Sequence, residues 1–212
     1  MESEQSNAPF DGESWRTFGR WACWVGVAFF AVYPACNWIT ATRSSSLSLL
    51  VPGELSIPFI PAFVWPYLSM YLLFLTPPLA LKPAELEALG KRLVIGTLVA
   101  GVMFLLMPMT LTFPRVEPPA EPYAGLFRFL FTIDQPHNLV PSLHVVFSAL
   151  ISLALIAASQ SRLLRAAVTA WLLLLVASTL LVHQHHLLDA VSGLALASVL
   201  HLYIKGRPEH AK

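Results

Sequence analysis

The sequence predicts an all-α protein, a polytopic membrane helix bundle with six transmembrane spans and both termini in the cytoplasm. Three observations lead to this prediction. Only 12% of the 212 residues are charged and the mean hydropathy is +0.66, whereas a soluble domain carries about 25% charged residues. The apolar residues gather in blocks of roughly twenty, the length that crosses a bilayer core. Most basic residues fall on one side of these blocks.

Six apolar blocks form the predicted spans. They cover residues 19–40, 57–81, 93–113, 143–160, 166–183 and 187–204. With the N-terminus inside, ten of the thirteen Lys and Arg residues lie in inner segments, and only Arg43, Arg115 and Arg128 lie in outer ones. The positive-inside rule therefore supports cytoplasmic termini and three outer loops.

One membrane domain is expected over 15–205, between a disordered cytoplasmic tail at 1–14 and a short cytoplasmic tail at 206–212. The first residues are acidic and lack the basic start and early apolar run of a cleavable signal peptide. Cys23 and Cys36 lie in one predicted helix, about 20 Å apart, which is too far for a disulfide. The net charge of +1 gives no case for nucleic acid binding.

The long outer loop at 114–142 contains the stretch YAGLFRFLF, which places four apolar residues at helical spacing around Arg128. This pattern favours a short helix lying on the outer membrane surface; a plain connector is the alternative. Asp134 follows this stretch, and we expect it to cap or brace the loop rather than to take part in a site.

The stretch DQPHNLVPSLHVVFSAL, residues 134–150, opens the fourth span at its outer end. Proline is favoured at the first position of a helix, which here is Pro141. The amides of Ser142, Leu143 and His144 then have no acceptor within the helix. Free amides and the positive end of the helix dipole make an anion site, and His144 lies beside it.

The stretch LVHQHHLLDAVSGL, residues 181–194, places titratable groups among leucines and valines. Such groups at membrane depth indicate a functional site. His185 and Asp189 are four residues apart, so a helix brings them to one face. The aspartate can hold one imidazole nitrogen and leave the other as a nucleophile. Arg115 is expected on the same outer side, where it adds a positive charge.

These two motifs, PSLH and S…HQHHLLDAVSG, resemble those of the type 2 phosphatidic acid phosphatase superfamily, which is built on six membrane spans. The resemblance implies that His144 is the general acid and that His185 is the nucleophile that forms a phosphohistidine. It also implies that Asp189 orients His185 and that Ser142 binds phosphate. Ser178 precedes His185 by seven residues, as the family pattern requires.

Several positions depart from the family pattern. Thr179 stands where the third motif has arginine, and Leu143 stands where PSGH has glycine. The first motif keeps only Arg115, with Met109 near the place of its lysine. This degenerate pattern is similar to the branch that includes inositol phosphorylceramide synthases and related bacterial proteins.

The implied function is a lipid phosphatase or phosphotransferase that works in two steps without a metal or cofactor. Arg115 and Arg128 are the candidate cations for phosphate, Asn138 offers a neutral donor, and Leu143 offers its amide. A phosphomonoester approaches two negative charges at neutral pH, whereas a diester carries one. Because the site has few cations, phospho-headgroup transfer from a diester is favoured. The alternative is a simple lipid phosphate monoester phosphatase.

Other interpretations stay open at this point. His183 is expected to be structural, whereas His186 could reach the interface or contact phosphate. The histidine cluster could instead bind zinc, or the chain could be a non-catalytic lipid transporter. We expect a membrane lipid as substrate and the lipid bilayer as surroundings, and leave a homo-oligomer open. The location we favour is a bacterial inner membrane, with the active site on the periplasmic side.

Overall fold

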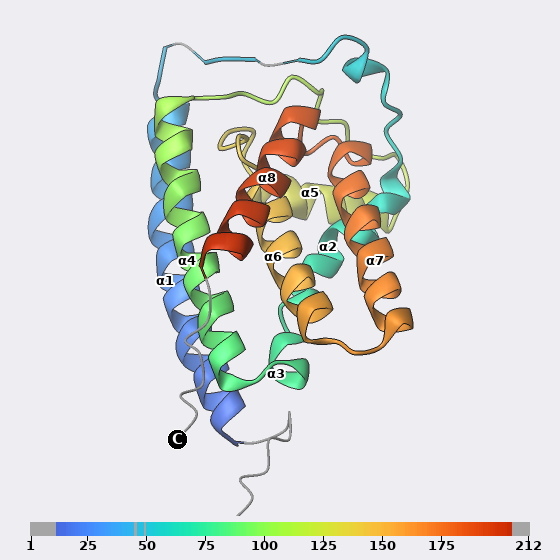
Figure 1. Cartoon of the computed structure of the whole chain (residues 1–212). Coiled ribbons are helices and arrows are strands. Elements are labelled where there is room, and N and C mark those ends of the chain that lie inside the picture. Colours follow the sequence, from blue (N-terminus) through green and yellow to red (C-terminus); the bar gives the residue numbers. More distant parts are fainter. Residues whose placement is uncertain (1–11, 45, 49, 205–212) are drawn as a thin grey trace, which may run out of the picture.

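Two long helices, α1 (Gly12–Ala41) and α4 (Pro83–Leu106), pack side by side and parallel at one edge of the molecule (Figure 1). The structure is a computed structural model that describes residues 12–204 except 45 and 49. Within these residues it contains eight α-helices and no strand, which confirms the all-helical fold. Residues 12–14, which were expected to belong to the tail over 1–14, belong to α1. Its other residues and the tail at 206–212 lie outside the described part.

Two glycines of α4 let the pair approach closely. A Cβ atom at Gly90 would overlap the Trp21 side chain, and one at Gly101 would overlap the Val32 side chain. Small residues at such positions bring helices of membrane proteins close together. The start of α4 is fixed by Glu85, whose carboxylate accepts from the backbone N–H of Lys82 at 2.8 Å.

The second predicted span, 57–81, is not one helix. It forms the 3-10 helix η2 (Pro61–Phe63), then α2 (Val64–Leu73) and the single turn α3 (Pro77–Ala80). Proline lacks the N–H that a helix interior needs, and the pair Pro77–Pro78 follows the end of α2. Another 3-10 helix, η1 (Glu54–Ser56), precedes them. The third predicted span, 93–113, is also displaced, because α4 ends before Pro108.

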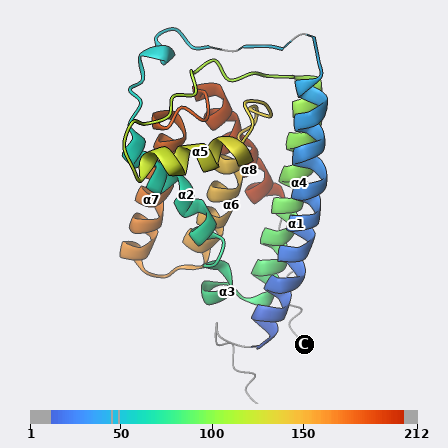
Figure 2. The ribbon, with the colours of Figure 1, turned by 180° about the vertical axis from the view of Figure 1, so that it is seen from behind.

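Four helices complete the bundle: α5 (Tyr123–Ile133), α6 (Leu143–Ala158), α7 (Arg162–Leu181) and α8 (Leu187–Tyr203). The central helix is α6, which packs on α2, α4, α7 and α8. Helix α5 runs across the bundle rather than along it (Figure 2). It confirms the helix expected in the outer loop, while its place on a membrane surface stays a prediction.

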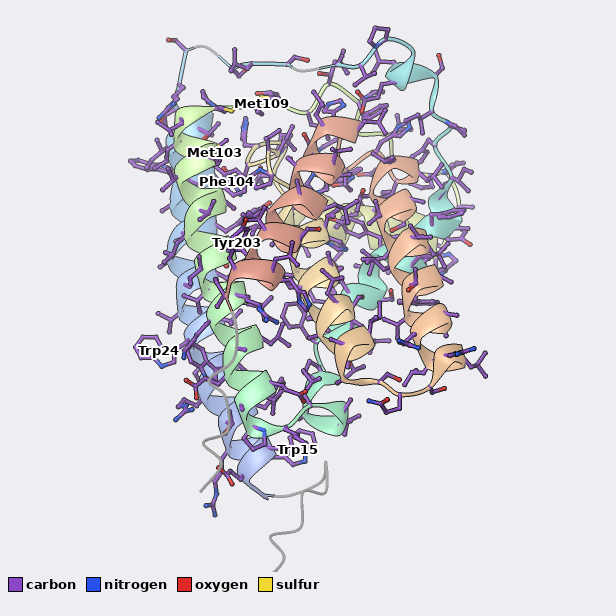
Figure 3. The ribbon with its side chains drawn as sticks, viewed as in Figure 1. Trp15, Trp24, Met103, Phe104, Met109 and Tyr203 are labelled. Atoms are coloured by element: carbon purple, nitrogen blue, oxygen red, sulfur yellow. The ribbon has the colours of Figure 1, made fainter. Side chains whose placement is uncertain are left out.

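Apolar side chains cover the outside of the bundle. Phe30 is 74% exposed, Leu173 is 64% exposed, and Trp24 points away from the α1–α4 pair (Figure 3). Continuous exposed apolar surface marks contact with a membrane or a partner. Three helices, α1, α4 and α7, are long and apolar enough to cross a bilayer, and α5, α6 and α8 are shorter apolar helices. The six spans and the side on which the termini lie stay predictions.

The helix directions bring several helix ends together. Helices α1, α4 and α7 finish at the end of the bundle where α6 and α8 begin (Figure 1). We call this the loop end. The segments 42–63 and 107–122 cross it, and they are joined where Leu47 pairs with Met109 in an isolated bridge. The two sequence motifs therefore lie at the same end of the molecule.

Candidate active site

The site is built where the first turns of α6 and α8 touch. The backbone N–H of Ser142 donates to the carbonyl oxygen of Asp189 at 3.1 Å. Gly193 permits this approach, since a Cβ there would lie 2.9 Å from the Ser142 carbonyl oxygen and 3.0 Å from Cβ of Val145. The contact fixes the two motifs, which are about forty residues apart in sequence, relative to one another.

His185 is held by Asp189. Its Nδ1 lies 3.3 Å from Oδ2 of Asp189, and the carboxylate is fully buried. The same oxygen accepts from the backbone N–H of His186 at 2.7 Å, which caps α8. Because a carboxylate oxygen accepts, Nδ1 of His185 carries the proton and Nε2 carries the lone pair. Within the described residues, Nε2 has no hydrogen-bond partner.

His144 is held by Tyr67 of α2. Its Nε2 donates to the carbonyl oxygen of Tyr67 at 2.8 Å, and the two rings stack with centroids 3.9 Å apart. A carbonyl oxygen can only accept, so Nε2 carries the proton and the lone pair is on Nδ1. The structure gives Nδ1 no hydrogen-bond partner among the described residues. His144 can therefore accept a proton at Nδ1.

The first amides of α6 form a second feature of the site. Oγ of Ser142 accepts from the backbone N–H of Val145 at 3.3 Å, as a helix cap does. The N–H groups of Leu143 and His144 precede the first intrahelical bond and face no acceptor among the described residues. They are two of the three amides that the sequence predicted for an anion; the third, of Ser142, donates to the Asp189 carbonyl oxygen instead.

A cavity of about 690 Å³ opens beside these groups, between α1, α2, α4 and α6. Its polar end includes Asp134, Asn138, His144 and His185. The rest is lined by apolar side chains, and on α1 it extends from Tyr33 to Phe18, a rise of about 22 Å. The structure thus places both histidines at the polar end of one long apolar cavity.

The family model for the PAP2 superfamily matches residues 55–203, which is more than half of the chain. The chain belongs to the PAP2 superfamily. No curated protein and no solved structure matches it. Members of the superfamily are phosphatases and phosphotransferases, so membership supports an enzyme with lipid phosphatase-type activity. With its apolar helices, this PAP2 chain is an integral membrane protein.

The two candidate arginines of this PAP2 chain do not line the cavity. Arg115 donates to the main-chain oxygen of Phe131 at 3.2 Å and to that of Asp134, and its guanidinium lies over the Phe131 ring. Burial lowers the pKa of Arg115. Arg128 is exposed and pairs with Glu121 at 3.0 Å. Arg115 thus caps the end of α5, and Arg128 lies outside the cavity lining.

Asn138 lines the cavity, and one of its two amide N–H donors is already used. Nδ2 donates to the carbonyl oxygen of Tyr33 at 2.8 Å. Since that oxygen can only accept, the NH₂ group must face it. The carbonyl oxygen of Tyr33 on α1 therefore competes with phosphate for the expected donation from Asn138.

The other two histidines of the cluster bind neighbouring loops. His186 is fully buried, accepts from the backbone N–H of Thr112 at 3.1 Å through Nε2, and places Nδ1 3.3 Å from Glu54. The structure therefore does not bring His186 to the cavity, where a phosphate contact was one of the two interpretations. His183 donates from Nε2 to the carbonyl oxygen of Ile57 at 2.9 Å, the kind of structural role that was expected.

Two residues that support the site were not found from the sequence. Glu54 is buried, accepts from the backbone N–H groups of Leu187 and Val51, and so holds the start of α8. The sequence does single out Glu54, because it is the only acidic residue between Glu13 and Glu85. No sequence pattern singles out Tyr67, since its contact with His144 depends on where the broken second span places α2.

The zinc interpretation requires a set of ligands. Among the described residues, no three or more His, Cys, Asp or Glu side chains group in a way that could hold a metal ion. Nδ1 of His185 faces Asp189 and Nε2 of His144 faces Tyr67, so the two rings are oriented by partners on separate elements. An imidazole with a free lone pair can act as a nucleophile or as an acid–base group.

Proposed function

We propose that this PAP2 superfamily member is a lipid phosphotransferase or phosphatase that forms a phosphohistidine on His185. The observation that carries the proposal is the orientation of two imidazoles in one cavity. Asp189 holds His185 with the Nε2 lone pair free, and Tyr67 holds His144 with the Nδ1 lone pair free. One group can attack phosphorus while the other moves a proton.

In the first step, Nε2 of His185 attacks phosphorus and the bond to the leaving ester oxygen breaks. For this step His144 carries protons on both nitrogens, and the proton on Nδ1 goes to the leaving oxygen. Asp189 stabilises the positive charge that develops on the phosphorylated imidazole. The amides of Leu143 and His144 supply hydrogen bonds to the phosphoryl oxygens.

In the second step, an alcohol or water attacks the phosphorus and the P–N bond breaks. His144 is now neutral and takes the proton of the attacking oxygen at Nδ1. The Tyr67 carbonyl selects the neutral tautomer that this step needs, with the proton on Nε2 and the lone pair on Nδ1. The positioned acid–base group contributes about 10²–10⁴-fold to such transfers.

The shape of the cavity supports a lipid substrate. Its polar end holds both histidines, and its apolar part follows α1 for about 22 Å, a large part of the hydrocarbon thickness of a bilayer. An acyl chain placed there would leave the phosphoryl group at His185. A water-soluble phosphate ester would leave this apolar surface uncovered.

The charges at the site favour transfer of a phospho-headgroup over hydrolysis of a monoester. Among the residues that the structure describes, no Lys or Arg lines the cavity, and the one charged side chain that does is Asp134. A diester brings one negative charge into this environment, whereas a monoester approaches two. We therefore propose a diester donor and an alcohol acceptor, as in the inositol phosphorylceramide synthase branch that the sequence resembles.

We also propose that the site faces the periplasm from a bacterial inner membrane. The support is the distribution of basic residues along the helices. Arg43, Arg115 and Arg128 lie toward the loop end, and seven others lie toward the opposite end: Arg16, Arg20, Lys82, Lys91, Arg92, Arg162 and Arg165. The positive-inside rule places the opposite end in the cytoplasm.

The test is to trap the intermediate on purified protein in mixed micelles with lipids labelled at phosphorus. We expect an acid-labile, base-stable label that is lost in His185→Gln and kept in His201→Gln, a histidine of α8 outside the cavity. Product analysis then separates free phosphate from a new phospholipid. Full turnover by His185→Gln, or inactivation of the wild type by a chelator, would contradict the mechanism.

A further inference from the structure

Asp134 is the only charged side chain among the described residues that line the cavity. It follows the last residue of α5 and is half-buried. Its Oδ1 accepts from the hydroxyl of Tyr33 at 2.6 Å, and its Oδ2 accepts from the hydroxyl of Tyr67 at 2.8 Å. Both oxygens accept hydrogen bonds, as those of a carboxylate do.

This carboxylate lies close to the reacting groups. Tyr67 connects it to His144, because the Tyr67 hydroxyl contacts Asp134 while the Tyr67 ring stacks on the imidazole. One aromatic ring therefore separates the negative charge from the proposed acid–base group. A phosphoryl group between His144 and His185 would lie within the field of Asp134.

An arginine, Arg115, contacts the main chain of Asp134 rather than its carboxylate. Arg115 donates to the main-chain oxygen of Asp134 and to that of Phe131, and does not line the cavity. Asn138, which is neutral, donates one amide N–H to the carbonyl oxygen of Tyr33. Within the described part of the chain, the polar end of the cavity therefore presents one carboxylate and no cationic side chain that remains charged throughout catalysis.

We propose that Asp134 selects substrates by charge: it disfavours dianionic phosphomonoesters and so commits the site to singly charged phosphodiesters. This inference rests on the proposed function. At an effective dielectric constant of about 20, one unit of charge roughly 8 Å away changes a binding or rate constant by about thirty-fold. Asp134→Asn makes the site one unit more positive whatever Arg115 contributes, so the preference should shift toward monoesters.

The experiment compares two lipids with identical acyl chains, phosphatidic acid and phosphatidylmethanol, in mixed micelles at pH 8. At this pH the monoester carries close to two charges and the methyl diester carries one. Cleavage at the lipid oxygen releases diacylglycerol from both, so one product measures both reactions. The readout is the ratio of the two kcat/KM values for the full-length protein.

We expect the wild type to favour phosphatidylmethanol, and Asp134→Asn to shift the ratio toward phosphatidic acid by about ten-fold or more. Asp134→Glu keeps the charge and should keep the ratio. Tyr33→Phe is the matched control, because it removes a hydrogen bond to Asp134 without changing charge. A structural role would make Tyr33→Phe and Asp134→Asn lower both reactions alike.

Arg115→Gln provides a second, opposite test should Asp134→Asn fail to fold. It removes a positive charge, so the preference for phosphatidylmethanol should increase. The selection by charge is overturned if the ratio of the two kcat/KM values is unchanged in Asp134→Asn. If only Arg115→Gln folds, an unchanged ratio in that variant overturns it. If the wild type releases no diacylglycerol from either lipid and forms no phosphohistidine, it is the proposed function that fails.

Discussion

A single carboxylate oxygen of Asp189 both orients His185 and caps α8, the helix to which Asp189 belongs. Oδ2 lies 3.3 Å from Nδ1 of His185 and accepts from the backbone N–H of His186 at 2.7 Å. The position of the proposed nucleophile is therefore tied to the first turn of α8. That turn is tied in turn to α6 through the bond from Ser142 N–H to the Asp189 carbonyl oxygen.

Replacing Asp189 by asparagine should remove most of the activity. An amide can present its NH₂ group to Nδ1, which shifts the imidazole proton to Nε2 and blocks the lone pair that attacks phosphorus. The loss expected from a wrong tautomer with a missing charge is about 10³–10⁴-fold in kcat. Rapid-quench measurement of phosphohistidine formation checks it. Ser192→Ala, which removes a hydrogen bond to the Asp189 carbonyl oxygen only, should form the intermediate normally.

Replacing Glu54 by glutamine should loosen the start of α8. Glu54 accepts from Leu187 and Val51 with its two oxygens and faces Nδ1 of His186, and glutamine keeps only one acceptor oxygen. Leaving a buried donor without a partner costs about 1–3 kcal/mol. We expect a lower thermal midpoint in detergent together with a fall in kcat.

Glu85→Gln is the control for this prediction. Glu85 caps the start of α4 in a similar way, through the backbone N–H of Lys82, but it is exposed and lies at the opposite end of the bundle. It should leave kcat unchanged. Equal effects of the two substitutions on kcat would show that Glu54 does not position the site.

The residues proposed for chemistry could be predicted from sequence because local spacing carries them. The helix positions expected for them were wrong, because His185 lies just before α8, with Asp189 in its first turn, and Pro141 lies before the cap residue of α6. The short separations along the chain still bring these residues together, so neither relation depends on distant packing. The contacts of Arg115 and Arg128 could not be predicted in this way. An arginine on the outer side can face the cavity or cap α5, and the choice depends on where α5 lies across the bundle.

The architecture was predictable to a similar extent. Apolar blocks gave the long helices α1, α4 and α7, since length and composition suffice there. They did not predict the breaks between η2, α2 and α3, because the block 57–81 is apolar throughout and only its prolines divide it. Tyr67 reaches His144 and Asp134 only through that broken arrangement, which is why the sequence did not reveal it.

Replacing Gly193 by alanine should separate the two motifs. The added Cβ would meet the Ser142 carbonyl oxygen at 2.9 Å and Cβ of Val145 at 3.0 Å. Because the first contact is with backbone, α6 and α8 must move apart. We expect at least a ten-fold fall in kcat, with a cost in stability of about 1–3 kcal/mol.

The matched control for Gly193 is Gly19→Ala in α1. A Cβ at Gly19 meets nothing within 4 Å, and the residue is exposed outside the cavity. Its kcat should equal that of the wild type. Should Gly193→Ala be as active as Gly19→Ala, close contact between the two first turns is not needed for the reaction.

Filling the cavity should change which lipids react. Val25 is 8% exposed and lines the cavity on α1 between Phe18 and Tyr33, whereas Val27 on the outer face of the same helix is 61% exposed. Tryptophan at 25 adds a large ring to the apolar part, away from His144 and His185. A long acyl chain would lose its place, while a short chain would still leave its phosphoryl group at the histidines.

The measurement is the ratio of kcat/KM for dioleoyl and dihexanoyl forms of one phospholipid, for Val25→Trp and Val27→Trp. We expect Val25→Trp to lower the ratio by about ten-fold or more, which corresponds to about 1.4 kcal/mol or more of lost chain binding. Val27→Trp faces outward and should keep the wild-type ratio. Since both variants place tryptophan on α1, a general effect of the substitution would move the two ratios together. That result would show that acyl chains do not occupy the cavity during turnover.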